Sequence, residues 1–496
     1  MSLFGVQGLL KDSRVWVGLF AGVLGAAFSW RPSYWYDEGA TVFAAQRPLP
    51  DLLRFLDHQD AVHGLYYLAM HFWFRLVGES EFTARLPSAL AVGVAAAGVV
   101  TLGQLVADRR TALLAGLVFA ILPRVTWAAV EARSYACTAT AAVWLTVVLV
   151  VALRRGRWPW WAGYALGCAV SIVLFIDMAT LVIAHALVVV VLNRKAFAAW
   201  GTAAVAGGLL ALPAARVISS QSGQVAWIPA PDRHMIRALL EYQWFVGAPV
   251  FAVLALALMV VGVVRVRGRL VAVALPWALV PTGLLVGYSL IEPVYLDRYL
   301  TFTTPAVALL VGAGIGALAS TRWIALAMLG ALIAAAVPAY VAQRGEWSKP
   351  SGMDFSAVAA FMADHGRPGD CVLFANSSAW NPTSARVAKN IRPSAFDGLR
   401  DVGAGRSAVA EGWLWDENLQ LSAVNLGDCT VLWYIGDADR DAAHTIRHTS
   451  NEVWPLGPYH FDASPDHALL VERGFVVDQQ WQLHMSQIVR LTAARR

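Results

Sequence analysis

Eleven long apolar segments, joined by short loops, fill most of the chain before residue 343 and limit its fold more than any other feature. Hydrophobic residues make up 58% of the 496 residues and charged residues only 14%, a balance that is foreign to soluble proteins of this length. An α-helix of about 20 apolar residues crosses a bilayer. The sequence therefore predicts a polytopic α-helical membrane protein with about 11 transmembrane helices. The predicted spans are residues 14–30, 86–106, 110–128, 136–153, 159–176, 178–193, 197–216, 245–264, 270–290, 301–319 and 323–342.

Basic residues gather in every second loop between these segments. By the positive-inside rule these loops face the cytoplasm, so the +5 net charge gives no indication of nucleic-acid binding. An odd number of spans then leaves the N-terminus cytoplasmic and the C-terminal tail outside, with span one retained as an anchor in the plasma membrane. The loops 31–85, 129–135, 217–244 and 291–300 also face outward. The cytoplasmic loops carry Lys11, Arg14, Arg109, Arg110, Arg154, Arg155, Arg157, Arg194, Lys195, Arg265, Arg267, Arg269 and Arg322.

The hydrophobic pattern changes after residue 343. An amphipathic helix is predicted at 354–365 and another helix at 465–473, and strands at 371–375, 429–435 and 483–492. Such alternation is typical of a small α/β domain. We therefore expect a transmembrane catalytic domain over 1–343 and an extracytoplasmic α/β domain over 344–496.

Two of the four cysteines, Cys371 and Cys429, each follow a Gly-Asp pair and begin a predicted strand of this domain. An oxidising exterior permits a disulfide between them, and two free buried cysteines are the alternative. Cys137 and Cys168 fall in or beside spans and are interpreted as small core residues.

An acidic pair, Asp37-Glu38, lies in an aromatic stretch directly after the first span. Carboxylates at the edge of a bilayer are costly to hold unless they bind or react with something. A carboxylate there is suited to remove a proton from an attacking hydroxyl. A solvated loop pair is the structural alternative.

The rest of the loop 31–85 looks like a folded platform. Residues 65–77 are apolar but short for a crossing and are predicted to lie along the membrane surface; a span here would invert the arginine pattern of every later loop. Asp60, His63, Tyr66 and Arg85 are weaker candidates for sugar contacts or for scaffolding.

His58, Asp60 and His63 are a candidate metal site. Their spacing is loose and no fourth ligand is near in sequence, so sugar or hydroxyl hydrogen bonding is preferred to a metal site. No cofactor is expected, and a divalent metal lacks support. The chain also has no Walker A motif, no glycine-rich dinucleotide loop and no DxD-type nucleotide-sugar motif.

Two further clusters place arginine beside tyrosine at the predicted outer end of a helix. The first is Glu131-Ala-Arg133-Ser-Tyr135, and the second contains Arg298 and Tyr299. Arginine, a phenol and a helix N-terminus together suit a phosphate. Pairing of Arg133 with Glu131 or Asp37 alone is the structural alternative. Asp177 and Glu292 would add to this site or cap helices, and residues 217–244, with Gln224 and Trp227, would cover it.

On these residues the chain resembles GT-C fold glycosyltransferases of the group that contains protein O-mannosyltransferases and the aminoarabinose transferase of lipid A. The acidic pair Asp37-Glu38, the stretch HGLYYLAMHFWFRLVGESEFTARLPSAL over 63–90, EARSYA over 131–136 and RYL over 298–300 carry the resemblance, which spans roughly residues 15–310. His63-Gly64 departs from the His-Pro or Pro-Pro that often precedes Leu-Tyr-Tyr, which weakens inferences about the acceptor.

The resemblance implies a polyprenyl-phosphate sugar donor and an inverting displacement at the outer membrane face. By analogy Asp37 is the base and Glu38 orients it or binds the acceptor, although the order of these two roles stays open. Arg133, Tyr135, Arg298 and Tyr299 would hold the departing lipid phosphate, with Glu131 a weaker contact.

The expected acceptor is a cell-envelope glycan, glycolipid or protein, and mannose is the first-choice sugar. Only four of the 38 basic residues are lysine, a bias typical of GC-rich actinobacterial genomes, whose envelopes contain mannans. Arabinofuranosyl transfer is the second choice. A lipid-linked sugar flippase or transporter is the alternative from another class, and a noncatalytic envelope scaffold is the third.

Overall fold

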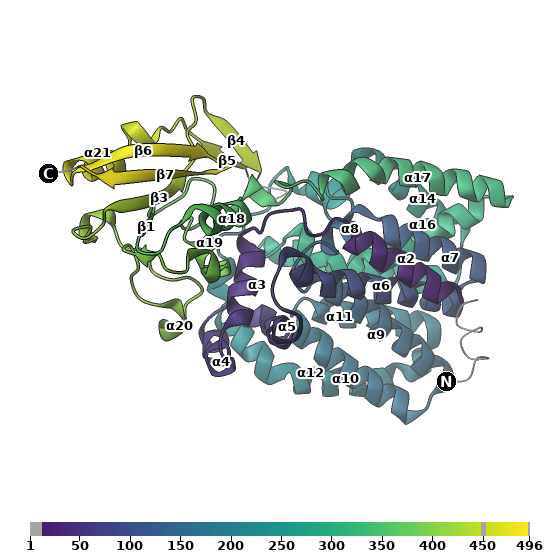
Figure 1. Cartoon of the computed structure of the whole chain (residues 1–496). Coiled ribbons are helices and arrows are strands. Elements are labelled where there is room, and N and C mark those ends of the chain that lie inside the picture. The colour runs from purple at the N-terminus through teal and green to yellow at the C-terminus, as the bar shows by residue number, and fades with distance from the viewer. Residues whose placement is uncertain (1–11, 448–452, 495–496) are drawn as a thin grey trace, which may run out of the picture. The chain divides into compact units, whose positions relative to one another are not determined.

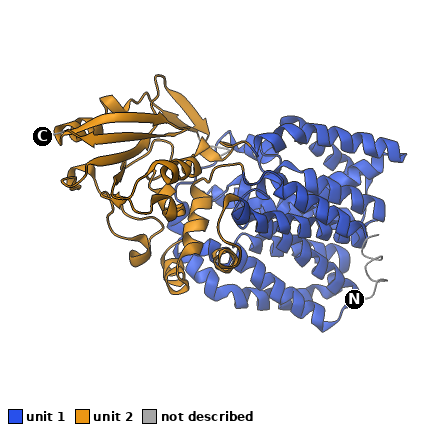
Figure 2. Ribbon diagram, in the orientation of Figure 1, with its two compact units in different colours: residues 1–30, 60–66, 82–344 blue, residues 31–59, 67–81, 345–496 orange. Residues whose placement is uncertain are grey.

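The computed structural model describes residues 12–447 and 453–494, so the predicted cytoplasmic Lys11 lies outside the described residues. The chain divides into two compact units (Figure 2). Unit 1 comprises residues 1–30, 60–66 and 82–344, and unit 2 comprises residues 31–59, 67–81 and 345–496. Most of the predicted outer loop 31–85 therefore belongs to the same unit as the C-terminal residues.

Unit 1 is built of α-helices, and a helix covers each of the eleven predicted apolar segments. The helices are α2 (Ser13–Ala26), α6 (Glu81–Val106), α7 (Arg109–Ile121), α8 (Pro123–Ala128), α9 (Tyr135–Arg155), α10 (Trp158–Leu174), α11 (Met178–Asn193), α12 (Phe197–Ser220), α13 (Met235–Arg237), α14 (Pro249–Arg265), α15 (Arg269–Ser289), α16 (Thr304–Leu318) and α17 (Arg322–Ala342). Unit 1 also contains the 3-10 helices η1 (Ala61–His63) and η5 (Asp297–Thr303).

Six stretches of helix within the described residues are long and apolar enough to cross a membrane, and one of them, Met178–Ser220, holds two predicted spans. Ser13–Ala26, Trp158–Leu174 and Pro249–Arg265 are shorter apolar helices. The chain is thus a multi-pass helical membrane protein, as predicted, while the count of eleven crossings stays a prediction.

Helix α16 is almost wholly buried because small residues let its neighbours approach closely. A Cβ atom on Gly314 would lie 2.0 Å from the carbonyl oxygen of Leu258 in α14, and one on Gly262 would lie 2.4 Å from that of Leu310. Only glycine fits at both positions. Close backbone approach of this kind is how helices associate in lipid, where no hydrophobic effect drives them together.

Unit 2 joins three helices from the first part of the chain to a C-terminal α/β domain (Figure 1). The first three are α3 (Tyr36–Gln46), α4 (Leu49–His58) and α5 (Gly64–Val77), the last of which begins in unit 1. Helix α5 covers residues 65–77 and has 14 residues, fewer than a helix needs to span a bilayer. This length agrees with the predicted surface helix.

The C-terminal domain contains a mixed five-stranded sheet of order β2-β1-β3-β7-β6. Strand β1 pairs in parallel with β2 and β3, and β7 runs antiparallel to β3 and β6. The elements are α18 (Phe355–His365), β1 (Cys371–Phe374), α19 (Val387–Ile391), β2 (Arg400–Asp401), α20 (Ala408–Glu411), β3 (Val431–Asp437), β4 (His444–Arg447), β5 (Val453–Leu456), α21 (Pro465–Glu472), β6 (Phe475–Gln482) and β7 (Ser486–Ala493).

The predicted helices at 354–365 and 465–473 and the predicted strands at 371–375, 429–435 and 483–492 correspond to α18, α21, β1, β3 and β7. The predicted small α/β domain is confirmed. Strand β6 was missed because it is an edge strand whose polar side chains are largely exposed, and β2 has only two residues.

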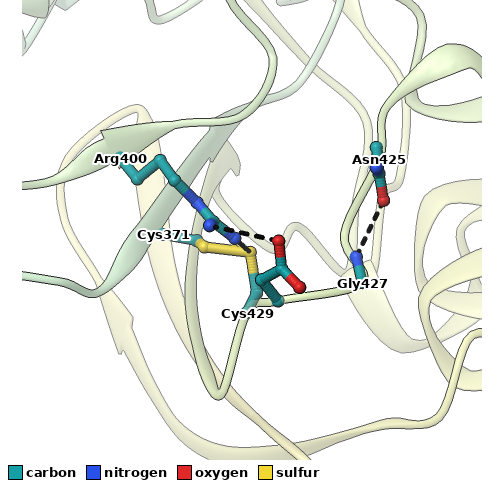
Figure 3. The surroundings of a disulfide bond; sticks show 6 residues. Cys371, Arg400, Asn425, Gly427 and Cys429 are labelled. Carbon is teal, nitrogen blue, oxygen red and sulfur yellow. Dashed lines mark hydrogen bonds and ion pairs between the residues drawn. A yellow bond between two sulfur atoms is a disulfide. The ribbon is translucent and has the colours of Figure 1, made fainter.

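A disulfide joins Cys371 at the start of β1 to Cys429 just before β3, with Cα atoms 5.8 Å apart (Figure 3). The guanidinium of Arg400 donates a hydrogen bond of 3.2 Å to Sγ of Cys429 and lies 3.7 Å from the carboxylate of Asp428. Of the two alternatives for these cysteines, the disulfide is the one present. Cys137 and Cys168 are free, as predicted, and Cys168 is buried.

Candidate active site

The first turn of α3 carries the acidic pair, and backbone contacts within unit 2 fix its position. The backbone N–H of Ser33 donates to the carbonyl oxygen of Glu346 (2.8 Å). The backbone N–H of Ser356 donates to the Ser33 hydroxyl (3.1 Å). The backbone N–H of Tyr34 donates to the Ser356 hydroxyl (3.0 Å). The first turn of a helix favours acidic side chains, because its N–H groups carry partial positive charge. The acidic pair is therefore on rigid secondary structure and not in a solvated loop.

The two acids have different surroundings. Glu38 is fully buried, and the Nζ atom of Lys349, itself 2% exposed, lies 3.4 Å from its Oε1 atom. Asp37 is only half-buried. A buried carboxylate needs a partner of opposite charge, and Lys349 is suited to that role for Glu38. Asp37 is the more exposed member of the pair.

The second group of residues lies in unit 1, where η5 meets the start of α9. The Nε atom of Arg298 donates to the hydroxyl of Tyr135 (3.2 Å), and both side chains are buried. The Tyr299 ring lies 6.5 Å from the Tyr135 ring and 5.3 Å from the Phe175 ring, measured between centroids. The two tyrosines and Phe175 thus form an aromatic wall beside the guanidinium.

The acidic neighbour of Arg298 is engaged elsewhere. A terminal nitrogen of Arg124 lies 2.5 Å from Oδ2 of Asp297, and the same guanidinium donates to the carbonyl oxygens of Tyr242 and Gln243. The Asp297 carboxylate therefore fixes the start of η5 by pairing with Arg124. This arrangement orients the segment that carries Arg298.

His63 connects this group to the 60–66 segment. Its ring lies 6.0 Å from the Phe175 ring. Burial lowers the pKa of His63 well below its usual value, and the positive charges of Arg133 and Arg298 lower it further. His63 is therefore neutral at physiological pH. Because both guanidinium groups act on one imidazole, the two arginines form a positively charged region of unit 1 that an anion would neutralise.

The segment 217–244 packs against these residues. Gln224 and Gln221 accept hydrogen bonds from the backbone N–H groups of Asp60 (3.1 Å) and Ala61 (2.9 Å). The guanidinium carbon of Arg298 lies 5.9 Å from the Trp227 ring centroid. The predicted cover thus lies against Arg298 and the 60–63 turn.

Comparison with known proteins agrees with this architecture. A family model for dolichyl-phosphate-mannose-protein mannosyltransferases matches residues 65–218. The crystal structure of ArnT from Cupriavidus metallidurans in the apo state aligns with a TM-score of 0.58 and 14% identity, over 96% of this chain and 97% of ArnT. The chain has the GT-C fold of ArnT. No curated protein matches it in sequence.

Two other solved structures share this fold at lower similarity. The arabinofuranosyltransferase AftD from Mycobacteria aligns with a TM-score of 0.50 and 15% identity, over 97% of this chain and 40% of AftD. The archaeal oligosaccharyltransferase AglB from Archaeoglobus fulgidus aligns with a TM-score of 0.50 and 10% identity, over 88% of this chain and 70% of AglB. Identities this low establish the fold alone, and the resemblance identified from the sequence is confirmed.

Among the weaker candidate residues, two are fully buried in unit 1. Arg85 is fully buried and donates to the carbonyl oxygen of Ser29 (2.7 Å). Glu131 is also buried, and its carbonyl oxygen accepts from the Ser88 hydroxyl (2.6 Å). Tyr66 is buried and Asp60 half-buried, with Asp60 in a left-handed conformation (φ 59°) at the start of η1.

Asp177 stands at the N-cap position of α11, but its side chain caps none of the described residues of that helix. Of the two alternatives for Asp177, helix capping is therefore not the one present in the described residues. Burial raises the pKa of Asp177 to about 7. Among residues 12–447 and 453–494, no group of three His, Cys, Asp or Glu side chains could hold a metal ion.

Sequence analysis missed several residues of these groups. Lys349, Arg124 and Phe175 contact candidates that are far away along the chain, and no local motif marks them. Lys349 offered one signal, since it is one of only four lysines in the sequence.

Proposed function

We propose that this protein moves a sugar, with mannose as the first choice, from a polyprenyl-phosphate donor to a cell-envelope glycan, glycolipid or protein. The observation that carries the proposal is the buried Arg298 guanidinium, which donates a hydrogen bond to the hydroxyl of Tyr135 (3.2 Å) beside the Tyr299 ring. The match of residues 65–218 to the mannosyltransferase family supports the sugar. ArnT has been solved with undecaprenyl phosphate and AglB with a dolichol-phosphate, which supports the class of donor.

The donor phosphate is assigned to the unit 1 residues Arg133, Tyr135, Arg298 and Tyr299. A guanidinium offers several N–H donors in a plane that matches phosphate oxygens. When the bond between the sugar and the phosphate breaks, negative charge grows on the departing phosphate. Fixed positive charge and a phenol lower the energy of this charged transition state most strongly where water is excluded. Arg298 and Tyr135 are both buried, so little water reaches them.

The role of general base is assigned to Asp37. Its carboxylate takes the proton of the acceptor hydroxyl while the hydroxyl oxygen attacks the anomeric carbon. The bond from that carbon to the phosphate oxygen breaks, and polyprenyl phosphate leaves with the electron pair, so the anomeric configuration inverts. Glu38, paired with Lys349 in the interior of unit 2, is assigned to positioning the first turn of α3.

The arginine-rich loops support a topology with the N-terminus in the cytoplasm and residues 344–496 outside. The reaction is accordingly proposed for the outer face of the plasma membrane. Residues 344–496 are proposed to act as a domain that guides the acceptor.

Arabinofuranosyl transfer is the second candidate, and the shared fold with AftD favours it. It requires the same phosphate-binding and proton-accepting groups, so only the donor sugar separates the two candidates. A flippase would move its lipid without a base and would be insensitive to the loss of one.

The experiment is a transfer assay with the full chain in nanodiscs, radiolabelled polyprenyl-phosphomannose and lipomannan. Asp37→Asn should lower transfer by roughly a hundredfold or more, the usual effect of removing a general base. Asp57→Asn, which changes an exposed carboxylate on α4 of the same unit, should transfer like wild type. Equal transfer by wild type and Asp37→Asn would contradict the role of Asp37. Transfer only from a polyprenyl-phosphoarabinose donor would replace mannose by arabinose.

A further inference from the structure

An aromatic cluster in unit 2 includes Tyr36, the residue that precedes the acidic pair in α3. The Trp415 ring stacks on the Phe43 ring with centroids 5.8 Å apart and an interplanar angle of 4°. It meets the Tyr36 ring edge-on, with centroids 5.3 Å apart. Tyr36 and Phe43 are on α3, two turns apart, and Tyr36 immediately precedes Asp37. The cluster thus joins the C-terminal domain to the helix that carries the proposed base.

Trp415 lies tightly against α3 at the acidic pair. A Cβ atom on Gly39 would lie 3.3 Å from Cη2 of Trp415 and 2.7 Å from Cδ1 of Ile391. Glycine directly after Glu38 is therefore what lets the indole and α19 approach the helix. The far edge of the Trp415 ring thus lies against the first turn of α3, which also carries Asp37 and Glu38.

The loop that carries Trp415 is held on both sides of the indole. Before it, Arg47 donates to the carbonyl oxygens of Trp413 (2.5 Å) and Leu414 (3.2 Å). After it, the Asp416 carboxylate accepts from the backbone N–H of Ala408 (2.7 Å) and from the Asn390 side chain (2.6 Å). A ring held in place loses little conformational entropy when a ligand binds to it.

The cluster differs from an ordinary hydrophobic core in its exposure. Tyr36, Phe43 and Trp415 are each half-buried, whereas the aromatic core residues Tyr34 and Trp35 beside them are fully buried. The residues that follow Tyr36 and Trp415 in the chain, Asp37 and Asp416, are polar. An exposed face of aromatic rings next to polar groups is typical of a binding surface.

A sugar ring matches this surface chemically. One face of a pyranose presents several C–H groups with partial positive charge, and the face of an aromatic ring carries partial negative charge. The hydroxyl groups at the rim of the sugar then remain available to polar neighbours. An aliphatic lipid chain would instead bring no group that uses the carboxylates next to the rings.

We propose that Trp415, together with Tyr36, forms a binding platform for a pyranose ring of a glycan acceptor. This inference rests on the proposed function and deepens it, because it names the acceptor class. The platform would hold the sugar residue next to Asp37, so that a hydroxyl of the glycan meets the base. Trp415 and Tyr36 would then select sugar-containing acceptors over simple alcohols.

The test compares Trp415→Ala with wild type in the full chain in nanodiscs. An α-mannan oligosaccharide serves as acceptor, and 1-octanol serves as a sugar-free acceptor. We expect the KM for the oligosaccharide to rise about tenfold, which is the loss of one aromatic contact, while the KM for the donor and the rate with 1-octanol stay within twofold. Trp415→Phe, which retains a ring, should give a smaller rise.

Trp413→Ala is the matched control. Its ring stacks on Arg406, and its carbonyl oxygen, which accepts from Arg47, survives the substitution. This variant should keep the wild-type KM. A Trp415→Ala KM within twofold of wild type would overturn the platform while leaving the proposed transfer intact.

Direct binding separates a failure of this inference from a failure of the proposed function. The oligosaccharide alone is titrated onto wild type and Trp415→Ala, and saturation-transfer NMR detects binding. Loss of binding in Trp415→Ala supports the platform even where no donor is turned over. Equal binding by both proteins would overturn it, whatever the enzyme transfers.

Discussion

Lys349 Nζ lies 3.4 Å from Oε1 of Glu38, and both side chains are buried in unit 2. Two adjacent acids that look equivalent in sequence are thereby given different surroundings. Glu38 is held in the interior by a cation from the segment that follows the last membrane helix, while Asp37 stays half-exposed. The relationship favours Asp37 as the group that meets a substrate.

Lys349→Met should destabilise the protein strongly. It leaves the Glu38 carboxylate buried without this cation, a change that costs about 3–5 kcal/mol in comparable pairs. The double variant Glu38→Gln with Lys349→Met should recover part of the loss, because no buried charge remains. Thermal unfolding in detergent measures both, and Lys195→Met, at an exposed lysine, is the control. A Lys349→Met midpoint equal to that of wild type would contradict the role of the pair.

The hydrogen bond between Arg298 and Tyr135 predicts a graded effect on donor use. Tyr135→Phe removes one hydrogen bond of 3.2 Å, worth about 0.5–1.5 kcal/mol, and should raise the donor KM by up to roughly tenfold. Arg298→Lys keeps the charge but loses the planar fork and should have the larger effect. Steady-state kinetics against the donor measure both. Arg237→Lys, at an exposed arginine paired with Glu241, is the control and should behave like wild type. Unchanged donor KM values in both Tyr135→Phe and Arg298→Lys would exclude this phosphate site.

His63 predicts a loss of stability in mild acid. Its pKa is well below the usual value in the folded protein, whereas an unfolded histidine titrates near 6.5. As the pH falls through that value, the unfolded chain takes up a proton that the folded one refuses. The free energy of unfolding therefore falls, by at most about 1.4 kcal/mol per pH unit, and above about pH 7.5 the histidine contributes nothing.

His63→Gln, which cannot take up this proton, should show a smaller drop in unfolding temperature between pH 7 and pH 5 than wild type. His234→Gln removes an exposed histidine of the same unit and should retain the wild-type drop. Identical drops in wild type and His63→Gln would show that His63 is not held neutral by its surroundings.

The disulfide between Cys371 and Cys429 should stabilise the C-terminal domain. Its cysteines are 58 residues apart in sequence, and closing a loop of this length removes about 4 kcal/mol of chain entropy from the unfolded state. Cys371→Ser with Cys429→Ser should lower the unfolding temperature by several degrees. Cys137→Ser, at a free cysteine, should lower the unfolding temperature less. Addition of reductant should lower the midpoint of wild type and of Cys137→Ser, which both keep the disulfide, but not that of the double variant.

The sequence by itself determined the elements whose signal is local. Each of the eleven apolar segments is helical, and α18, β1, β3 and β7 lie where hydrophobic periodicity predicts them. The reason is that burial in lipid or against a sheet acts on side chains within one helix or strand, so about 20 residues contain the information. The short motifs around Asp37, Arg133 and Arg298 were visible for the same reason.

Only the tertiary structure decided which residues meet across long distances in the chain. Lys349 pairs with Glu38, and Arg124 pairs with Asp297. The charges of Arg133 and Arg298 both act on His63. The Trp415 ring contacts the Tyr36 ring. The tertiary structure also joins residues 31–59 to the C-terminal domain as one compact unit. Such pairings depend on the path of the whole chain. The residues next to a buried charge or ring in the sequence do not indicate which distant residue compensates its burial.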